Sequence, residues 1–230
     1  MSDSRAFYAR SGSAWDDLVT MLHLPYTAWH LSYVAIGAGL AAVLDWKILA
    51  GTLLAFFFGL GIGAHALDEV HDRPLRTGLS DSTLWALGIG GLVAGGALGV
   101  IGAFVISPVL LAWVALGVVL AAGYGLEWSP ILHSDWGFSV AWGAFPVLVG
   151  YWAQTESLSI TVALIAASTT VLSRVQRELS TPARKIRRTD DAVEVSGWTR
   201  DQLLSTWERP LRLMSMAMPL LALGLLASHL

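Results

Sequence analysis

The sequence predicts an all-α membrane protein, a single domain over residues 1–230 built as a bundle of about seven transmembrane helices. Hydrophobic residues make up 55% of the chain and charged residues 13%, whereas an ordinary soluble domain carries roughly 25% charged residues. The apolar residues also form runs that can cross a bilayer, which takes roughly 20 residues of helix and as few as about 17. Finally, most basic residues fall in alternate connecting segments, as the topology of a multi-pass protein requires.

Seven apolar segments meet the length requirement. They are residues 28–44, 48–64, 84–107, 109–126, 136–154, 157–173 and 211–228. The third and fourth adjoin without a charged residue between them, but one helix over 84–126 would be about 64 Å long, twice the hydrocarbon thickness. We therefore expect a helical hairpin that turns at Ser107-Pro108, because proline suits a first helical position and pushes its predecessor out of helical geometry. Within it, Gly91, Gly95 and Gly99 have a spacing that lets helix backbones approach closely.

Two segments are expected to lie outside the bilayer. Residues 1–26 form a cytoplasmic or interfacial N-terminal segment, in which "SAWDDLVTMLHL" suits a short amphipathic helix ahead of Pro25. Residues 174–210 form a cytoplasmic loop before the last span. The sixth helix is expected to extend through Leu172 to Leu179, until Pro182 interrupts it.

The distribution of charge predicts the orientation. With a cytoplasmic N-terminus, 13 of the 14 Lys and Arg residues fall on the cytoplasmic side and only Lys47 falls outside, a strong positive-inside bias. We expect a multi-pass protein of the cytoplasmic (inner) membrane whose main partner is the lipid bilayer. No nucleic-acid partner is predicted, and the sequence leaves open whether the chain forms a homo- or hetero-oligomer.

A dense polar cluster follows the second apolar segment, in "GAHALDEVHDRPLRTG". If the helix continues, His65, Asp68, Glu69 and Asp72 share one face. Their oxygens suit Mg²⁺, and the imidazole of His65 would also suit Mn²⁺ or Zn²⁺. Alternatively, the cluster is a solvated helix end whose acids pair with the arginines at 73 and 76.

The stretch "HALDEVHDRPLRTG" resembles the first aspartate-rich motif of the UbiA superfamily of intramembrane prenyltransferases. Asp68 and Asp72 match the second and third aspartates of that motif, and "DRPLRTG" matches its arginine-proline segment, while Ala64-His65 replaces the leading Asn-Asp. The resemblance covers roughly residues 20–180. It implies a UbiA-like bundle around a lipid-accessible cavity, with Asp68 and Asp72 as catalytic residues and Mg²⁺ held by His65, Asp68, Glu69 and Asp72.

The function that the resemblance implies is prenyl transfer. A polyprenyl group would move from its diphosphate to an aromatic or lipid acceptor at the cytoplasmic edge, so the implied partner is a polyprenyl diphosphate or other isoprenoid lipid. Arginines suit the phosphate oxygens, and an aromatic ring can shield a carbocation. The implied substrate-binding residues are Arg73, Arg76, Tyr124, Arg174 and Arg177.

The sequence departs from the family pattern at the second aspartate motif, where Glu178 is the only acid before Asp190 and Asp191. A second interpretation therefore stays open: a non-catalytic UbiA-like protein that binds a quinone, an isoprenoid lipid or a metal, or a structural subunit of a membrane complex. A hybrid site could then combine the cluster with His133 and Asp135. A small transporter is a third interpretation. His30, inside the first apolar segment, is either functional or packed inward with a hydrogen bond.

Overall fold

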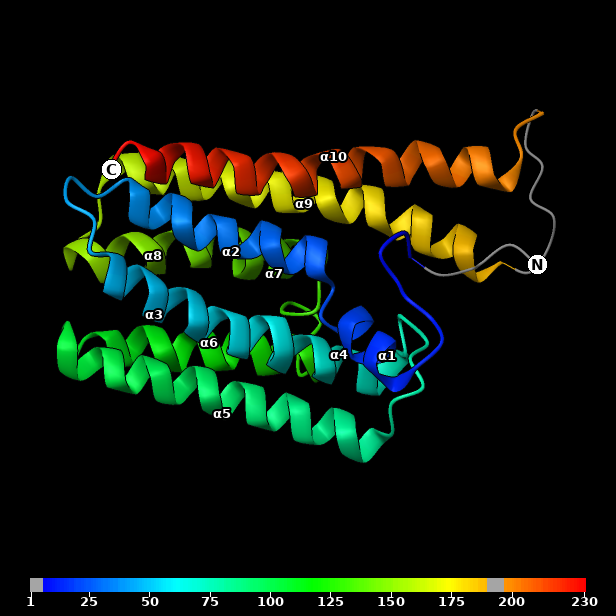
Figure 1. The fold of residues 1–230 in the computed structure, drawn as a ribbon, viewed down its shortest axis with the longest axis horizontal. Helices are drawn as coiled ribbons and strands as arrows, with labels where there is room; N and C mark the ends of the chain where they lie inside the picture. The colour runs from blue at the N-terminus through cyan, green and yellow to red at the C-terminus, as the bar shows by residue number, and fades with distance from the viewer. Residues whose placement is uncertain (1–5, 190–196) are drawn as a thin grey trace.

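The computed structural model describes residues 6–189 and 197–230, and within them the regular structure is helical (Figure 1). The side chain of Asp72 lies outside this description. The elements are α1 (Ala14–Met21), α2 (Leu24–Gly39), α3 (Trp46–Phe56), η1 (Phe57–Ala64), α4 (His65–Asp72), α5 (Asp81–Val105), α6 (Leu110–Gly125), α7 (Asp135–Ser139), η2 (Val140–Ala144), α8 (Phe145–Thr155), α9 (Ile160–Arg188) and α10 (Arg200–Ala227). The segments η1 and η2 are π-helical turns within longer helices.

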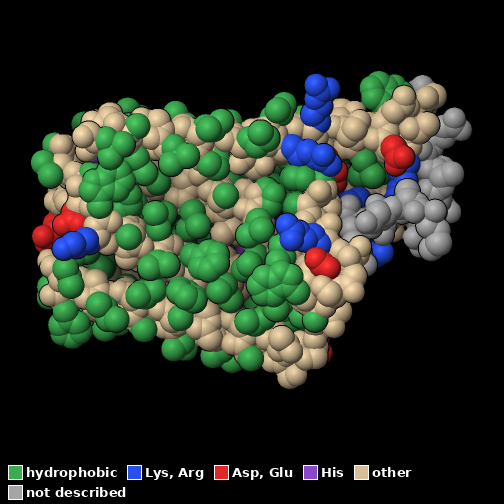
Figure 2. All heavy atoms as spheres, in the orientation of Figure 1, with side chains coloured by type: hydrophobic (Ala, Val, Ile, Leu, Met, Phe, Trp, Pro, Cys, Tyr) green, Lys and Arg blue, Asp and Glu red, His purple; other side chains and the backbone are tan. Residues whose placement is uncertain are grey.

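The long helices run side by side in one bundle (Figure 1). Helix α2 packs against α8 and α10, α9 packs against η2 and α10, and α5 packs against α3, η1 and α6. We call the end where α4 ends and α10 begins the charged end. On the face drawn in Figure 2, Lys, Arg, Asp and Glu side chains gather near this end and at the far tip, with a broad uncharged surface between them.

Three helices are long and apolar enough to cross a membrane: Trp46–His71, Asp81–Val105 and Arg200–Ala227. Their outward side chains include Phe104, 88% exposed, and Leu220, 67% exposed, and lipid is a far better solvent than water for such groups. The predicted helical membrane protein is thus supported by three helices. The remaining spans and the cytoplasmic N-terminus stay predictions.

The predicted hairpin is confirmed, since α5 ends at Val105 and α6 begins at Leu110. The predicted role of its glycines is also confirmed. A Cβ on Gly91 would lie 2.6 Å from the backbone nitrogen of Gly63, and a Cβ on Gly95 would lie 2.7 Å from the carbonyl oxygen of Ala55. Small residues therefore let α5 contact the backbone of α3 and η1 directly.

The core between α2 and α8 has the same close contact. Trp29 and Tyr33 on α2 are fully buried, and the indole N–H of Trp29 donates to the hydroxyl of Tyr33 at 2.6 Å. Further along, Gly37 meets the carbonyl of Val147 so closely that a Cβ would stand 2.1 Å from its oxygen. Helices α2 and α8 therefore contact each other through backbone as well as side chains.

The N-terminal and late segments differ in how well they were predicted. The short N-terminal helix is confirmed as α1, whose N-cap Ser13 accepts a hydrogen bond from the backbone N–H of Asp16, while its interfacial position stays a prediction. The predicted break at Pro182 is wrong, because α9 continues to Arg188. Fully buried Ala183 and an ion pair between Arg187 and Glu208 of α10 hold this last part, which offsets the cost of a proline inside a helix. Asp190 and Asp191 lie outside the described residues.

Candidate functional site

The two π-helical turns meet in the middle of the bundle. Leu60 and Ala64 of η1 pack with Trp142 of η2 and with Tyr124 at the end of α6. We call this group, completed by Ala121, Phe138 and Ala141, the aromatic plug. Single π-turns within α-helices occur often at functional sites.

The η2 turn explains why the His30 side chain points into the bundle. The carbonyl of Trp142 lacks its usual donor four residues on, because Pro146 has no N–H. The Nδ1 atom of His30, on α2, lies 3.0 Å from that carbonyl oxygen. Since a carbonyl can only accept, Nδ1 carries the proton and donates. His30 is therefore packed inward with a hydrogen bond, one of the two alternatives that the sequence left open.

Replacing His30 with leucine should lower the free energy of unfolding by about 1–3 kcal/mol, because it leaves a buried carbonyl without a donor. Thermal unfolding in detergent, followed by circular dichroism, measures the change. His71→Leu is the control, since His71 is exposed. An equal loss in both variants would contradict the role assigned to His30.

The polar cluster lies at the charged end, but its members have different surroundings. Glu69 is fully buried. Its carboxylate accepts hydrogen bonds of 2.9 Å from the backbone N–H groups of Leu75 and Thr77 and from the hydroxyl of Thr77. The oxygens of Glu69 thus hold the loop after α4, and its expected role as a metal ligand stays a prediction.

The arginines of the cluster are also placed differently from the prediction. Arg73 forms an ion pair with Asp81 and donates to the carbonyl of Leu79 at 2.6 Å, so it ties the loop to α5. Arg76 is exposed. Neither arginine forms an ion pair with Asp68 or Glu69 among the described residues, although the charge of Arg73 acts on Glu69.

Arg174 and Arg177 project from α9 and hold Asp135, at the start of α7. Both form ion pairs with its carboxylate, and the Nε–Oδ1 distance for Arg177 is 3.0 Å. Partial burial opposes ionisation of Asp135, but the hydrogen bonds from both arginines outweigh it and hold its pKa below the usual range. Two cations thus neutralise Asp135, so its carboxylate is not available for the hybrid metal site. Arg174 also forms an ion pair with Glu178.

Tyr124 is the member of the aromatic plug that contacts His133. Its ring packs against Trp142 at a centroid distance of 5.4 Å and stacks on His133 at 4.8 Å. The Nδ1 atom of His133 donates to the carbonyl of Tyr124 at 3.0 Å, and its Nε2 atom lies 3.5 Å from a carboxylate oxygen of Glu127.

Two charged side chains near this point have no hydrogen bond or ion pair with any described residue: Asp68 of α4 and Arg184 of α9. The positive charges of Arg184 and Arg177 act on the carboxylate of Asp68, and His133 lies near it. Arg184 also acts on Tyr8, from the N-terminal segment. Both side chains are half-buried. We call the space around Asp68 and Arg184 the polar mouth.

A histidine pair borders the polar mouth. His65 stacks on His23 with ring centroids 4.4 Å apart, and its Nδ1 atom donates to the carbonyl of Gly61 at 3.2 Å. His23 stands between α1 and α2 with a φ of 46°. Sequence analysis missed His23, Tyr8 and the central place of Arg184, because no local pattern reveals a contact with a folded-back N-terminal segment.

The predicted metal ligands do not come together in the part of the chain that the structure describes. Residues 6–189 and 197–230 contain no group of three or more His, Asp or Glu residues arranged to hold a metal ion. Asp68 is placed at the mouth, Glu69 and Asp135 have other partners, and the side chain of Asp72 is not described. The donor set therefore does not fit Mg²⁺ as it was expected to.

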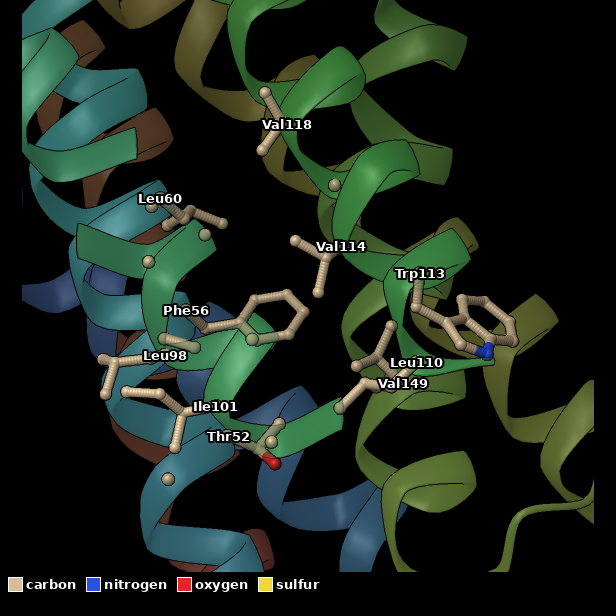
Figure 3. Close-up of a pocket in the computed structure, with 18 of the residues that line it drawn as sticks. Thr52, Phe56, Leu60, Leu98, Ile101, Leu110, Trp113, Val114, Val118 and Val149 are labelled. Carbon is tan, nitrogen blue, oxygen red and sulfur yellow. The ribbon is translucent and has the colours of Figure 1, made fainter. Parts of the chain in front are cut away.

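A cavity of about 600 Å³ lies on the other side of the aromatic plug, between α3, α5, α6 and α8 (Figure 3). Phe56 and Val114 point toward each other across it, and Leu98 and Ile101 line it from α5. Its inner end reaches Leu60, Ala121 and Trp142, and its outer end reaches Asp45 and Lys47. The lining is apolar apart from this outer end and Thr52. No protein-family model, curated protein or solved structure matches the chain.

Proposed function

We propose that the protein binds an isoprenoid or quinone-type lipid within the membrane, with the tail in the apolar cavity and the polar head group toward the charged end. The observation that carries this proposal is the cavity itself. Its volume of about 600 Å³ falls within the range of roughly 300–1,000 Å³ typical of small-molecule sites. A strongly polar ligand would lose its hydration in such a lining without compensation, whereas a hydrocarbon tail can pass from the bilayer into the cavity without that cost.

The neighbourhood of the cavity favours a lipid with a polar head over a plain hydrocarbon. Trp142 lines the inner end of the cavity and also packs against Tyr124. Tyr124 in turn stacks on His133, which borders the polar mouth. A ligand that passed the aromatic plug would therefore meet hydrogen-bonding groups within a few ångströms of the apolar lining.

Filling the cavity should weaken binding. Gly51 lines it, and a Cβ there meets no atom within 4 Å, so Gly51→Leu can place its side chain in the cavity without a backbone clash. We expect at least about tenfold weaker binding of a short-chain menaquinone, equivalent to about 1.4 kcal/mol. Quenching of tryptophan fluorescence in nanodiscs measures the affinity, because Trp113 and Trp142 both line the cavity.

The matched control is Gly90→Leu. Gly90 is exposed on α5, does not line the cavity and also has free space around its Cβ. It should leave the affinity unchanged. Absence of quenching in the wild-type protein, or equal affinities in the two variants, would contradict a lipid site in this cavity.

A second candidate function is prenyl transfer, and one observation favours it. Asp68, which matches an aspartate of the UbiA motif, points to the polar mouth without a partner among the described residues. In such a reaction the bond from the prenyl carbon to the diphosphate oxygen breaks, pyrophosphate leaves with the electron pair, and the acceptor bonds to the prenyl carbon and loses a proton. The described residues do not assemble a site for Mg²⁺.

Pyrophosphate release tests this candidate. Purified protein should release pyrophosphate from geranylgeranyl diphosphate when Mg²⁺ and an aromatic acceptor are supplied, and Asp68→Asn should reduce the rate at least about 100-fold if the carboxylate acts on the reacting groups. Asp81→Asn, at the first residue of α5, is the control. Lipid binding without any release would leave the binding function and exclude the transferase.

A further inference from the structure

One buried polar atom at the polar mouth has no partner. The Nδ1 atom of His23 lies 2.9 Å from the hydroxyl oxygen of Tyr8, but the Nε2 atom of the same ring is buried and has no hydrogen-bond partner among the described residues. Buried polar atoms are nearly always paired, and an exception calls for an explanation such as a missing ligand.

The surroundings of His23 determine whether its Nε2 atom is a hydrogen-bond donor or an acceptor. Burial, together with the nearby His65 and Arg184, lowers the pKa of His23 well below its usual range, so the ring is neutral. Burial also raises the pKa of Tyr8 well above its usual range, so the phenol keeps its proton. When Tyr8 donates to Nδ1, the single ring proton of His23 sits on Nε2. The pair then presents one buried N–H donor that lacks an acceptor.

The Nε2 donor of His23 is connected to the inner end of the cavity through the helix that carries His65. His23 stacks on His65. Leu60 lies at the inner end of the cavity, and His65 comes five residues after it in one continuous helix, a rise of about 8 Å. Arg184, without a partner among the described residues, acts on His23 from α9. One ring stack and five helical residues therefore separate the donor from the inner end of the cavity.

We infer that Tyr8 and His23 form the head-group site for the bound lipid, in which the Nε2 N–H of His23 donates a hydrogen bond to a carbonyl oxygen of a quinone-type ring. This inference rests on the proposed lipid-binding function and specifies its ligand. Tyr8 is a positioning residue: it fixes the proton of His23 on the nitrogen that faces the ligand. The N-terminal segment that carries Tyr8 is therefore part of the site.

The affinity for two ligands tests the inference. The first is a short-chain menaquinone, and the second carries the same tail on a naphthalene ring without oxygens. His23→Phe keeps a ring that can stack on His65 but has no N–H, and it should bind menaquinone about tenfold more weakly, the loss expected for about 1.4 kcal/mol. Tyr8→Phe should lose about three- to tenfold, because the proton on His23 is then free to move. The control variant His71→Phe should bind both ligands as the wild type does.

The oxygen-free ligand should bind the wild type and the His23 and Tyr8 variants equally, since it makes no use of the donor. A second readout is the infrared carbonyl stretch of ¹³C-labelled menaquinone. It should lie at lower frequency in the wild type than in His23→Phe, which a loss of packing alone would not produce.

The outcomes separate the two proposals. Wild-type binding with unchanged menaquinone affinity in His23→Phe, or with no shift of the carbonyl stretch, would overturn the head-group site and leave the lipid-binding function standing. Absence of binding to the wild type by either ligand would overturn both. Should His23→Phe fail to fold, Tyr8→Phe decides through the same carbonyl shift.

Discussion

Replacing Gly37 with alanine is expected to lower the free energy of unfolding by about 3 kcal/mol, the upper end of the usual cost of inserted volume, because the added group here has nowhere to go. The added Cβ would stand 2.1 Å from the carbonyl oxygen of Val147 and 3.0 Å from the backbone nitrogen of Tyr151. Both are backbone atoms, so relief requires α2 and α8 to separate. That separation would loosen the core around Trp29 and Tyr33, which are fully buried between these helices.

Thermal unfolding in detergent measures this loss, and a chain of this size should melt about 6–12 °C lower for a loss near 3 kcal/mol. Gly90→Ala is the matched control, because a Cβ at that exposed helical position meets no atom within 4 Å. There alanine should slightly raise stability, by about 0.5–1 kcal/mol, through its better helix propensity. If both variants melted at the same temperature, the close contact of α2 and α8 would be disproved.

Replacing Glu69 with glutamine is expected to cost about 2–4 kcal/mol. The carboxylate is fully buried and accepts from the backbone N–H groups of Leu75 and Thr77 on its two oxygens. Glutamine is almost the same size but turns one acceptor into a donor, so one buried N–H of the loop would face another N–H. Hydrogen bonds to a charged acceptor contribute about 1.5–3 kcal/mol, and an unpaired buried donor adds its own penalty.

The loss should appear as a lower melting temperature and as faster hydrogen exchange at the backbone amides of residues 75 and 77. Glu156→Gln is the control, since Glu156 is exposed at the end of α8. A metal-ligand role predicts the opposite pattern: unchanged stability without metal, and a difference only when a divalent cation is added. The exchange measurement therefore separates a structural Glu69 from a ligating one.

The sequence predicted much of the fold because the relevant signals are local. Apolar runs determine which segments avoid water, and the Ser107-Pro108 pair marks the turn between α5 and α6. The four-residue glycine spacing predicted close helix contacts, and Gly91 and Gly95 have them. The break expected at Pro182 failed because local propensity was overridden by contacts that α9 makes with α10.

The candidate site was predicted only in part, because its members depend on partners that are distant in the sequence. Asp68 and Glu69 are neighbours, yet Asp68 faces the polar mouth while Glu69 is held by the loop through Thr77. Likewise, arginines expected to bind phosphate are held by Asp135, which lies 39 and 42 residues before them.

By itself the sequence determined that this chain is helical, that its apolar segments suit a membrane and that its basic residues gather at one end. Each of these follows from composition and from the spacing of residues along a helix. Tertiary structure alone decided which polar groups stay free. A charge or a hydrogen-bond donor is neutralised by whatever segment folds against it. Among the described residues, Asp68 and Arg184 act on each other only through their charges, without a hydrogen bond, and the Nε2 atom of His23 has no hydrogen-bond partner.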